Sequence, residues 1–126
     1  MVNTARDNAH AFATVSPIIE SQGLTLETIS KEIHMTWRLS VQQEHRNFSL
    51  RYRLVGLLFA AKKLSGHGKF IAWVESNCSF TYRYAKALMW SGQLWDGGCR
   101  GWTAQVVEGL TKPADLLIRE YLEWAA

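Results

Sequence analysis

Apolar residues recur at spacings of three and four along much of the chain, which is the pattern of amphipathic helices. The first strong stripe comprises Leu26, Ile29, Ile33, Trp37 and Val41. Thr25 and Thr28 precede or open this stripe with the hydroxyl chemistry of a helix start. We therefore predict a helix from about residue 25 to about Arg46.

A second stripe is apolar over a wide arc, as expected for a helix buried on most of its surface. It comprises Leu50, Leu54, Leu57, Leu58, Ala61 and Leu64, with Tyr52, Val55 and Phe59 beside it. Gly66 and Gly68 follow, and glycines permit the left-handed backbone at which helices stop. This segment is predicted to be the central helix of the fold.

The rest of the chain is also helical in pattern. Residues 70–74 predict a short helix, residues 77–79 a turn and residues 81–90 another helix. Residues 1–23 are weakly periodic and predict a short helix or a partly ordered arm, whereas the glycine-rich residues 92–101 predict an irregular connection. Residues 103–110 have room for one or two helical turns, and Pro113 suits the first turn of a last helix. With no strand-like alternation, we predict an all-α fold: a single compact domain over residues 1–126, of about five or six helices.

Composition supports one folded domain and limits the cellular setting. The chain has 126 residues, 48% of them hydrophobic, and only two prolines. Cys78 and Cys99 form neither a disulfide framework nor a metal-binding pair, which favours a reducing compartment. The longest apolar run, residues 54–61, is too short for a membrane span, and the amino terminus lacks a signal-peptide pattern. We expect a cytoplasmic protein without membrane contact.

Charge is distributed unevenly along the chain. Residues 31–86 hold ten basic and three acidic side chains, a net charge of +7, whereas residues 1–30 and 87–126 each carry −2. A basic middle suits a surface that meets a polyanion such as DNA. The alternatives are an ordinary solvated helix face and a basic centre that the acidic flanks cover.

Residues 70–89 have the layout of a helix-turn-helix, in which the second helix leaves one face free for a major groove. The predicted inner face of that helix comprises Ala85, Leu88 and Met89. Its predicted outer face is basic and aromatic, with Tyr82, Arg83, Lys86 and Trp90. Two short helices joined by a turn also occur in bundles that never bind nucleic acid, and Trp73 is expected in the core.

Arginine reads guanine or clamps phosphate, lysine neutralises phosphate, and tyrosine stacks on bases or donates to phosphate oxygens. Adding the lysines that precede the unit, the candidate nucleic-acid contacts are Tyr82, Arg83, Lys86, Lys69, Lys62 and Lys63.

The same stretch resembles a family of uncharacterised helical proteins carried by phages and plasmids. The resemblance rests on Lys62, the His-Gly-Lys-Phe-Ile-Ala-Trp run 67–73, the Glu-Ser-Asn turn 75–77, the run 80–86 and Met89. It covers residues 24–91, so that residues 1–23 would be an arm and residues 92–126 an extension. It implies a helix-turn-helix-like module of mobile elements, presumed to bind DNA, with no defined reaction. Tyr84, Ala87 and Leu88 depart from the family pattern, which makes a protein-binding role more credible.

The sequence contains no group of residues with the types and spacing of a catalytic or metal-binding site. His10, His34, His45 and His67 are scattered, without a second ligand at metal-binding spacing. No nucleophile elbow, phosphate-binding glycine loop or zinc-protease motif is present, and the glycines around Cys99 read as a loop. We expect a protein that is not an enzyme and has no cofactor or bound metal.

Six tryptophans are many for this length, and three of them lie between residues 90 and 102. Tryptophan and arginine dominate the energetics of many protein interfaces. The alternative interface comprises Trp90, Trp95, Trp102 and Arg100. It would make this a phage-type protein that binds and inhibits a host nucleic-acid-handling or defence complex.

Two functions therefore stand beside each other. The first is a DNA-binding, helix-turn-helix-like accessory or regulatory protein of a phage or plasmid, acting in the host cytoplasm. The second is the inhibitor of a host protein complex. A homodimer is compatible with either, because the helix near residues 25–46 or the last helix offers a seam.

Overall fold

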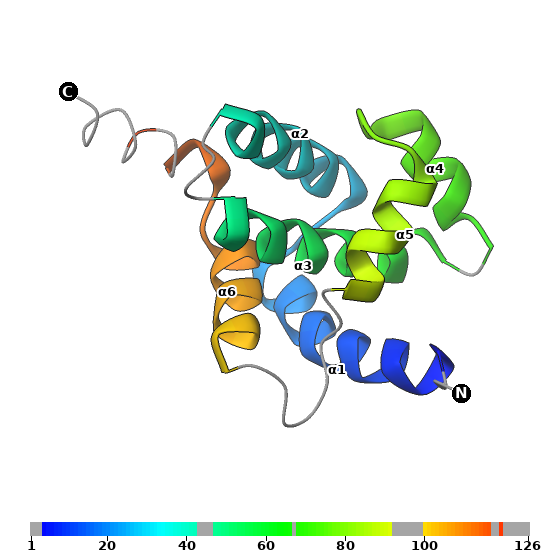
Figure 1. The fold of residues 1–126 in the computed structure, drawn as a ribbon. Helices are drawn as coiled ribbons and strands as arrows, with labels where there is room; N and C mark the ends of the chain where they lie inside the picture. Colours follow the sequence, from blue (N-terminus) through cyan, green and yellow to red (C-terminus); the bar gives the residue numbers. More distant parts are fainter. Residues whose placement is uncertain (1–3, 43–46, 67, 92–99, 117–118, 120–126) are drawn as a thin grey trace.

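A computed structural model shows a bundle of α-helices (Figure 1). The structure describes residues 4–42, 47–66, 68–91, 100–116 and 119. Within these ranges the helices are α1 (Thr4–Gln22), α2 (Leu26–Gln42), α3 (Asn47–Ser65), α4 (Phe70–Asn77), α5 (Tyr82–Ser91) and α6 (Arg100–Thr111). Residues 114–116 are helical again, and the described ranges contain no strand. The all-α prediction is confirmed.

Helix α3 is the centre of the bundle. It packs against α1, α2, α4, α5 and α6, and Figure 1 shows it crossing the middle of the molecule. Every residue from Tyr52 to Ala61 is buried. Burial on all sides follows from the wide apolar arc, because a helix that is apolar around most of its circumference is stable only when other helices cover it.

The helix boundaries near α2 and α3 follow the predicted local chemistry. The backbone N–H of Thr28 donates to the Thr25 hydroxyl at 3.2 Å, which satisfies one free donor at the start of α2. After α3, Gly66 and Gly68 have φ of 87° and 77°, the left-handed conformation that stops a helix at low cost only in glycine.

Two helices are longer than their sequence pattern indicates. In place of a short helix or partly ordered arm, α1 spans 19 residues. From Ala11 onward it buries one narrow row, Ala11, Val15 and Ile19, and it packs on α3 and α6, so its periodicity is weak. Likewise α6 starts at Arg100, inside the stretch predicted as an irregular connection, and buries Val106, Gly109 and Leu110. The segment 92–99 lies outside the described residues.

A buried ion pair joins three parts of the bundle. Arg53 of α3 is only 3% exposed; its Nε donates to the Thr36 hydroxyl at 2.9 Å, and its Nη2 donates to Glu32 Oε2 at 2.8 Å. The same carboxylate oxygen accepts the backbone N–H of Ala114 at 2.8 Å. Glu32 therefore links α2, α3 and the segment that follows α6.

This pair corrects the charge count made from sequence. Burial lowers the pKa of Arg53, while Glu32 and Glu108 act in the opposite direction, and a guanidinium stays charged at any ordinary pH. Its Nη1 is buried and finds no hydrogen-bond partner in the part of the chain that the structure describes. Arg53 thus belongs to the core and contributes nothing to a basic surface.

Helices α3 and α6 approach each other through glycines. A Cβ on Gly109 would lie 2.7 Å from Arg53 Cγ and 3.1 Å from Arg53 Cα. A Cβ on Gly56 would lie 2.7 Å from a methyl carbon of Val106. Because side chains at both crossing points would collide, the two helices require glycine there. No helix within the described ranges is long and apolar enough to span a membrane.

We predict that Glu32→Ala lowers the free energy of unfolding by about 3–5 kcal/mol, because it leaves the Arg53 guanidinium buried without its counter-charge. Urea unfolding followed by circular dichroism measures this. The control is Glu27→Ala, which removes an exposed acid from the first turn of the same helix. The double variant Glu32→Leu/Arg53→Met should be more stable than Glu32→Ala. A loss in Glu32→Ala no larger than in the control would contradict the assignment.

We predict that Gly109→Ala destabilises the fold by about 1–3 kcal/mol through overpacking, although alanine favours a helix by about 1 kcal/mol over glycine. The comparison is Val107→Ala, at an exposed position of α6, which should change stability little. Thermal melting of both variants gives the answer. A stabilised Gly109→Ala protein would show that α6 does not lie this close to α3.

Candidate nucleic-acid interface

Helices α4 and α5 form two short helices joined by residues 78–81, as predicted for a helix-turn-helix-like unit. Phe70 and Val74 bury the inner face of α4, four residues apart. Ala85, Leu88 and Met89 bury the inner face of α5, which packs on α3 and α4. The predicted inner face of the second helix is therefore confirmed.

Side chains of α4 and of the turn hold the start of α5 and the end of α4. The carboxylate of Glu75 accepts the backbone N–H of Tyr82 at 3.0 Å, and the Thr81 hydroxyl accepts the N–H of Tyr84 at 3.2 Å. Both bonds satisfy free donors at the start of α5, where a negative charge also meets the positive end of the helix dipole. An N–H of Asn77 closes the end of α4 on the Trp73 carbonyl at 3.0 Å.

The outer face of α5 is basic and aromatic. Arg83, Lys86, Ala87 and Trp90 are exposed, Trp90 by 51%, and α5 contains no acidic residue. No hydrogen bond or ion pair among the described residues engages Arg83 or Lys86. Both charges therefore remain available to an incoming anion.

Tyr82 differs from its expected outward position. It is half-buried, packs against the core and meets the Phe70 ring edge-on at 6.2 Å between centroids. Tyr82 lies three residues, about one turn, before the buried Ala85, so its side chain lies on the side of α5 that faces the core. Trp73 is half-buried against the core as well, with its ring stacked on Phe70.

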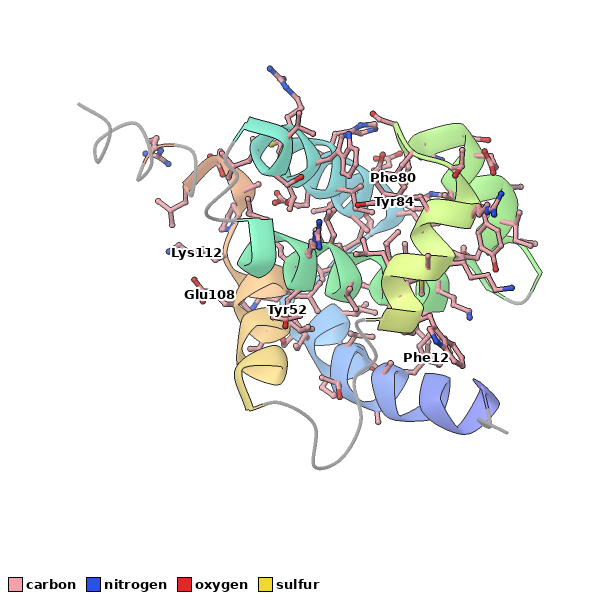
Figure 2. All side chains as sticks on the ribbon, viewed as in Figure 1. Phe12, Tyr52, Phe80, Tyr84, Glu108 and Lys112 are labelled. Carbon is pink, nitrogen blue, oxygen red and sulfur yellow. The ribbon has the colours of Figure 1, made fainter. Side chains whose placement is uncertain are left out.

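An aromatic cluster of Trp37, Phe80 and Tyr84 joins α2 to α5. The centroid of the Trp37 ring lies 5.1 Å from that of Phe80 and 5.4 Å from that of Tyr84, and the Phe80 and Tyr84 centroids are 5.4 Å apart. Figure 2 shows Phe80 and Tyr84 together beside α2 and α5. Phe80 is 8% exposed and Tyr84 39%, so the cluster runs from the core to the surface.

The three candidate lysines outside α5 have separate surroundings. Lys69 is exposed and precedes the first residue of α4. Lys62 is half-buried, and burial lowers its pKa. The Nζ of Lys63 lies 5.4 Å from the centroid of Phe12 on α1. No described contact joins these lysines to Arg83 or Lys86, so α5 carries the core of the candidate site.

The alternative protein interface is described only in part. Trp90 is exposed, but Trp95 lies outside the described residues, and for Trp102 and Arg100 only the helical backbone of α6 is described. Sequence reasoning missed Ile71, which is 52% exposed on α4. Its helical register gives a signal, since it does not share the row of Phe70 and Val74 that faces the core.

Cys78, in the turn between α4 and α5, has no features of a reactive thiol. Burial and the neighbouring Glu75 charge raise its pKa to about 11, so the thiol is protonated near neutral pH. Across the described residues, no three His, Cys, Asp or Glu side chains gather as metal ligands.

No family model, curated protein sequence or solved structure matches the chain. The resemblance to phage- and plasmid-borne helical proteins therefore stays a prediction.

We predict that Cys78, in a Cys99→Ser background, reacts slowly with iodoacetamide. At pH 8 its thiolate fraction is roughly one hundredth of that of a thiol with the ordinary pKa of 9.0, because the pKa is about 11. Mass spectrometry across pH 7–10.5 measures the rate, with the urea-unfolded protein as control. The folded rate should still rise tenfold per pH unit near pH 10. A rate that is half-maximal near pH 9 and levels off above pH 10 would contradict the raised pKa.

Proposed function

We propose that the protein binds duplex DNA through the outer face of α5. The observation that carries this proposal is a pair of exposed cations, Arg83 and Lys86, that no described residue pairs with, on a short helix whose opposite face is fixed in the core. Three residues apart, they lie on one side of the helix, about 5–6 Å from each other at Cβ. They present two phosphate or base contacts in a fixed orientation.

The dimensions and chemistry of α5 suit a major groove. Ten residues make a helix about 15 Å long, and a helix is about as wide as the groove that admits it. Arg83 reaches guanine bidentately or clamps a phosphate, and Lys86 neutralises a phosphate. Ala87 keeps the centre of the face small, which allows the backbone of α5 to approach the bases.

The role that follows is non-enzymatic. A DNA-binding accessory or regulatory protein needs a positioned cationic face, and α5 offers one without a catalytic group beside it. That such a role serves a phage or plasmid rests on the sequence resemblance, and the partner is DNA rather than a small molecule.

A specific observation supports the alternative function, the binding of a host protein. Trp90 and Ile71 expose about half of their surface on the same two-helix unit, and exposed aromatic and aliphatic side chains beside arginine favour a protein partner. In that function the unit inhibits a host nucleic-acid-handling or defence complex, and Trp90→Ala, rather than loss of charge, abolishes activity.

The test is fluorescence anisotropy with a labelled random duplex over a range of salt concentrations. Arg83→Ala/Lys86→Ala should weaken binding and reduce the slope of log K against log[salt] by about two, one for each lost phosphate contact. The control is Lys112→Ala/Arg119→Ala, which removes two exposed or half-buried cations that follow α6 and that lie 3.8 Å from Glu108 and Asp115. Figure 2 places Lys112 on the side of the bundle away from α5.

Two results would contradict DNA binding through α5. Absence of binding by the unsubstituted protein at low salt overturns it and favours the host-protein function. Equal losses in the α5 variant and the control show that only the net charge matters, which removes α5 from the site.

A further inference from the structure

We propose that α2 supplies a second set of phosphate contacts, Lys31 and Arg38, on the same face of the molecule as α5. This inference rests on the proposed binding of duplex DNA. It assigns a role to a helix outside the helix-turn-helix-like unit, where sequence analysis placed none of the candidate contacts.

The exposed positions of α2 form one stripe along the helix. Apart from Thr28 in the first turn, they recur at spacings of three and four, and comprise Glu27, Lys31, His34, Arg38 and Val41. The opposite side of α2 is buried, with Ile29, Ile33 and Thr36 in the core. Trp37 is half-buried and sits on the boundary between the buried side and the exposed stripe.

That boundary is the edge of α2 that meets α5. Trp37 contacts Tyr84 at 5.4 Å between ring centroids, and Tyr84 sits on the corresponding boundary of α5, between buried Ala85 and exposed Arg83. Phe80 lies below them, almost fully buried, so the Trp37–Tyr84 contact marks the outer side of the seam. The exposed stripes of α2 and α5 therefore border one continuous surface.

The charges of α2 reinforce those of α5. Lys31 and Arg38 take part in no ion pair or hydrogen bond that the described residues form. The one acidic residue of the exposed stripe, Glu27, lies in the first turn of α2, whereas Arg38 lies one residue after the Trp37 contact. Arg38 thus adds to Arg83 and Lys86 near the seam, and Lys31 extends the cationic stripe along α2, two turns before Arg38.

The spacing suits a groove and its rim. The Trp37–Tyr84 contact sets the exposed side of α2 beside that of α5, so we expect α2 to face a phosphate backbone when α5 enters the groove. Lys31 and Arg38 are seven residues apart, about 10 Å along the helix axis. That length covers about three nucleotides of one strand, whose phosphates recur every 3.4 Å of rise.

The experiment compares three double variants in the same salt-dependent anisotropy assay on a random duplex: Lys31→Ala/Arg38→Ala, Arg83→Ala/Lys86→Ala and the control Lys112→Ala/Arg119→Ala. The α2 variant should reduce the salt slope by about two relative to the unsubstituted protein. The control should reduce it by less than one. All four substituted cations of the two test variants are exposed, and thermal melting confirms that each protein is folded.

The outcomes separate this inference from the proposed function. If the α5 variant loses binding while the α2 variant matches the control, the role of α2 is overturned and the function of α5 stands. If the α2 variant loses binding while the α5 variant matches the control, α2 is supported and the α5 site is wrong. A protein that fails to bind duplex DNA overturns both.

Discussion

The half-buried carboxylate of Glu32 makes the contacts on which the arrangement of the bundle depends. One of its oxygens accepts from Arg53 of α3 and from the backbone of Ala114, 82 residues away in the chain. Removing water from an arginine is costly, so the pair is stable only if this geometry is kept. The glycine at position 109 lets α6 press against the Arg53 backbone, which closes the bundle around the pair. Helices α2, α3 and α6 are thereby fixed relative to one another.

The surface proposed to bind DNA is built on that fixed frame. Helix α5 has its inner face on α3 and α4, its first turn held by Glu75 and Thr81, and its flank joined to α2 by the Trp37, Phe80 and Tyr84 rings. Phosphate contacts gain most when the cations are already in position, because less conformational entropy is lost on binding. The rigid scaffold explains how a face with only a few charges can be specific in its geometry.

The sequence was sufficient for the features that depend on local periodicity. The central helix, the glycine stop after α3, the inner row of α5 and the exposure of Arg83, Lys86 and Trp90 all follow from spacings of three and four. The burial of Arg53 did not follow, because its partner Glu32 lies 21 positions away and no local pattern links them. The length of α1 could not be predicted for a related reason: only tertiary packing decides which row of a weakly amphipathic helix is covered. The outward position of Ile71 was missed although its register, off the row of Phe70 and Val74, indicates it. The functional roles of α5 and α2 remain proposals.

The most direct test of DNA binding by α5 is an NMR titration of the ¹⁵N-labelled protein with a short DNA duplex. If duplex DNA binds this surface, the amide chemical shifts change along the exposed stripes of α5 and α2. These stripes include Arg83, Lys86, Lys31 and Arg38. The amide chemical shifts near Gly109 in α6 and near Lys112 after it should not change. Changes confined to α6 or α1, or no changes at low salt, would contradict a DNA-binding face on α5.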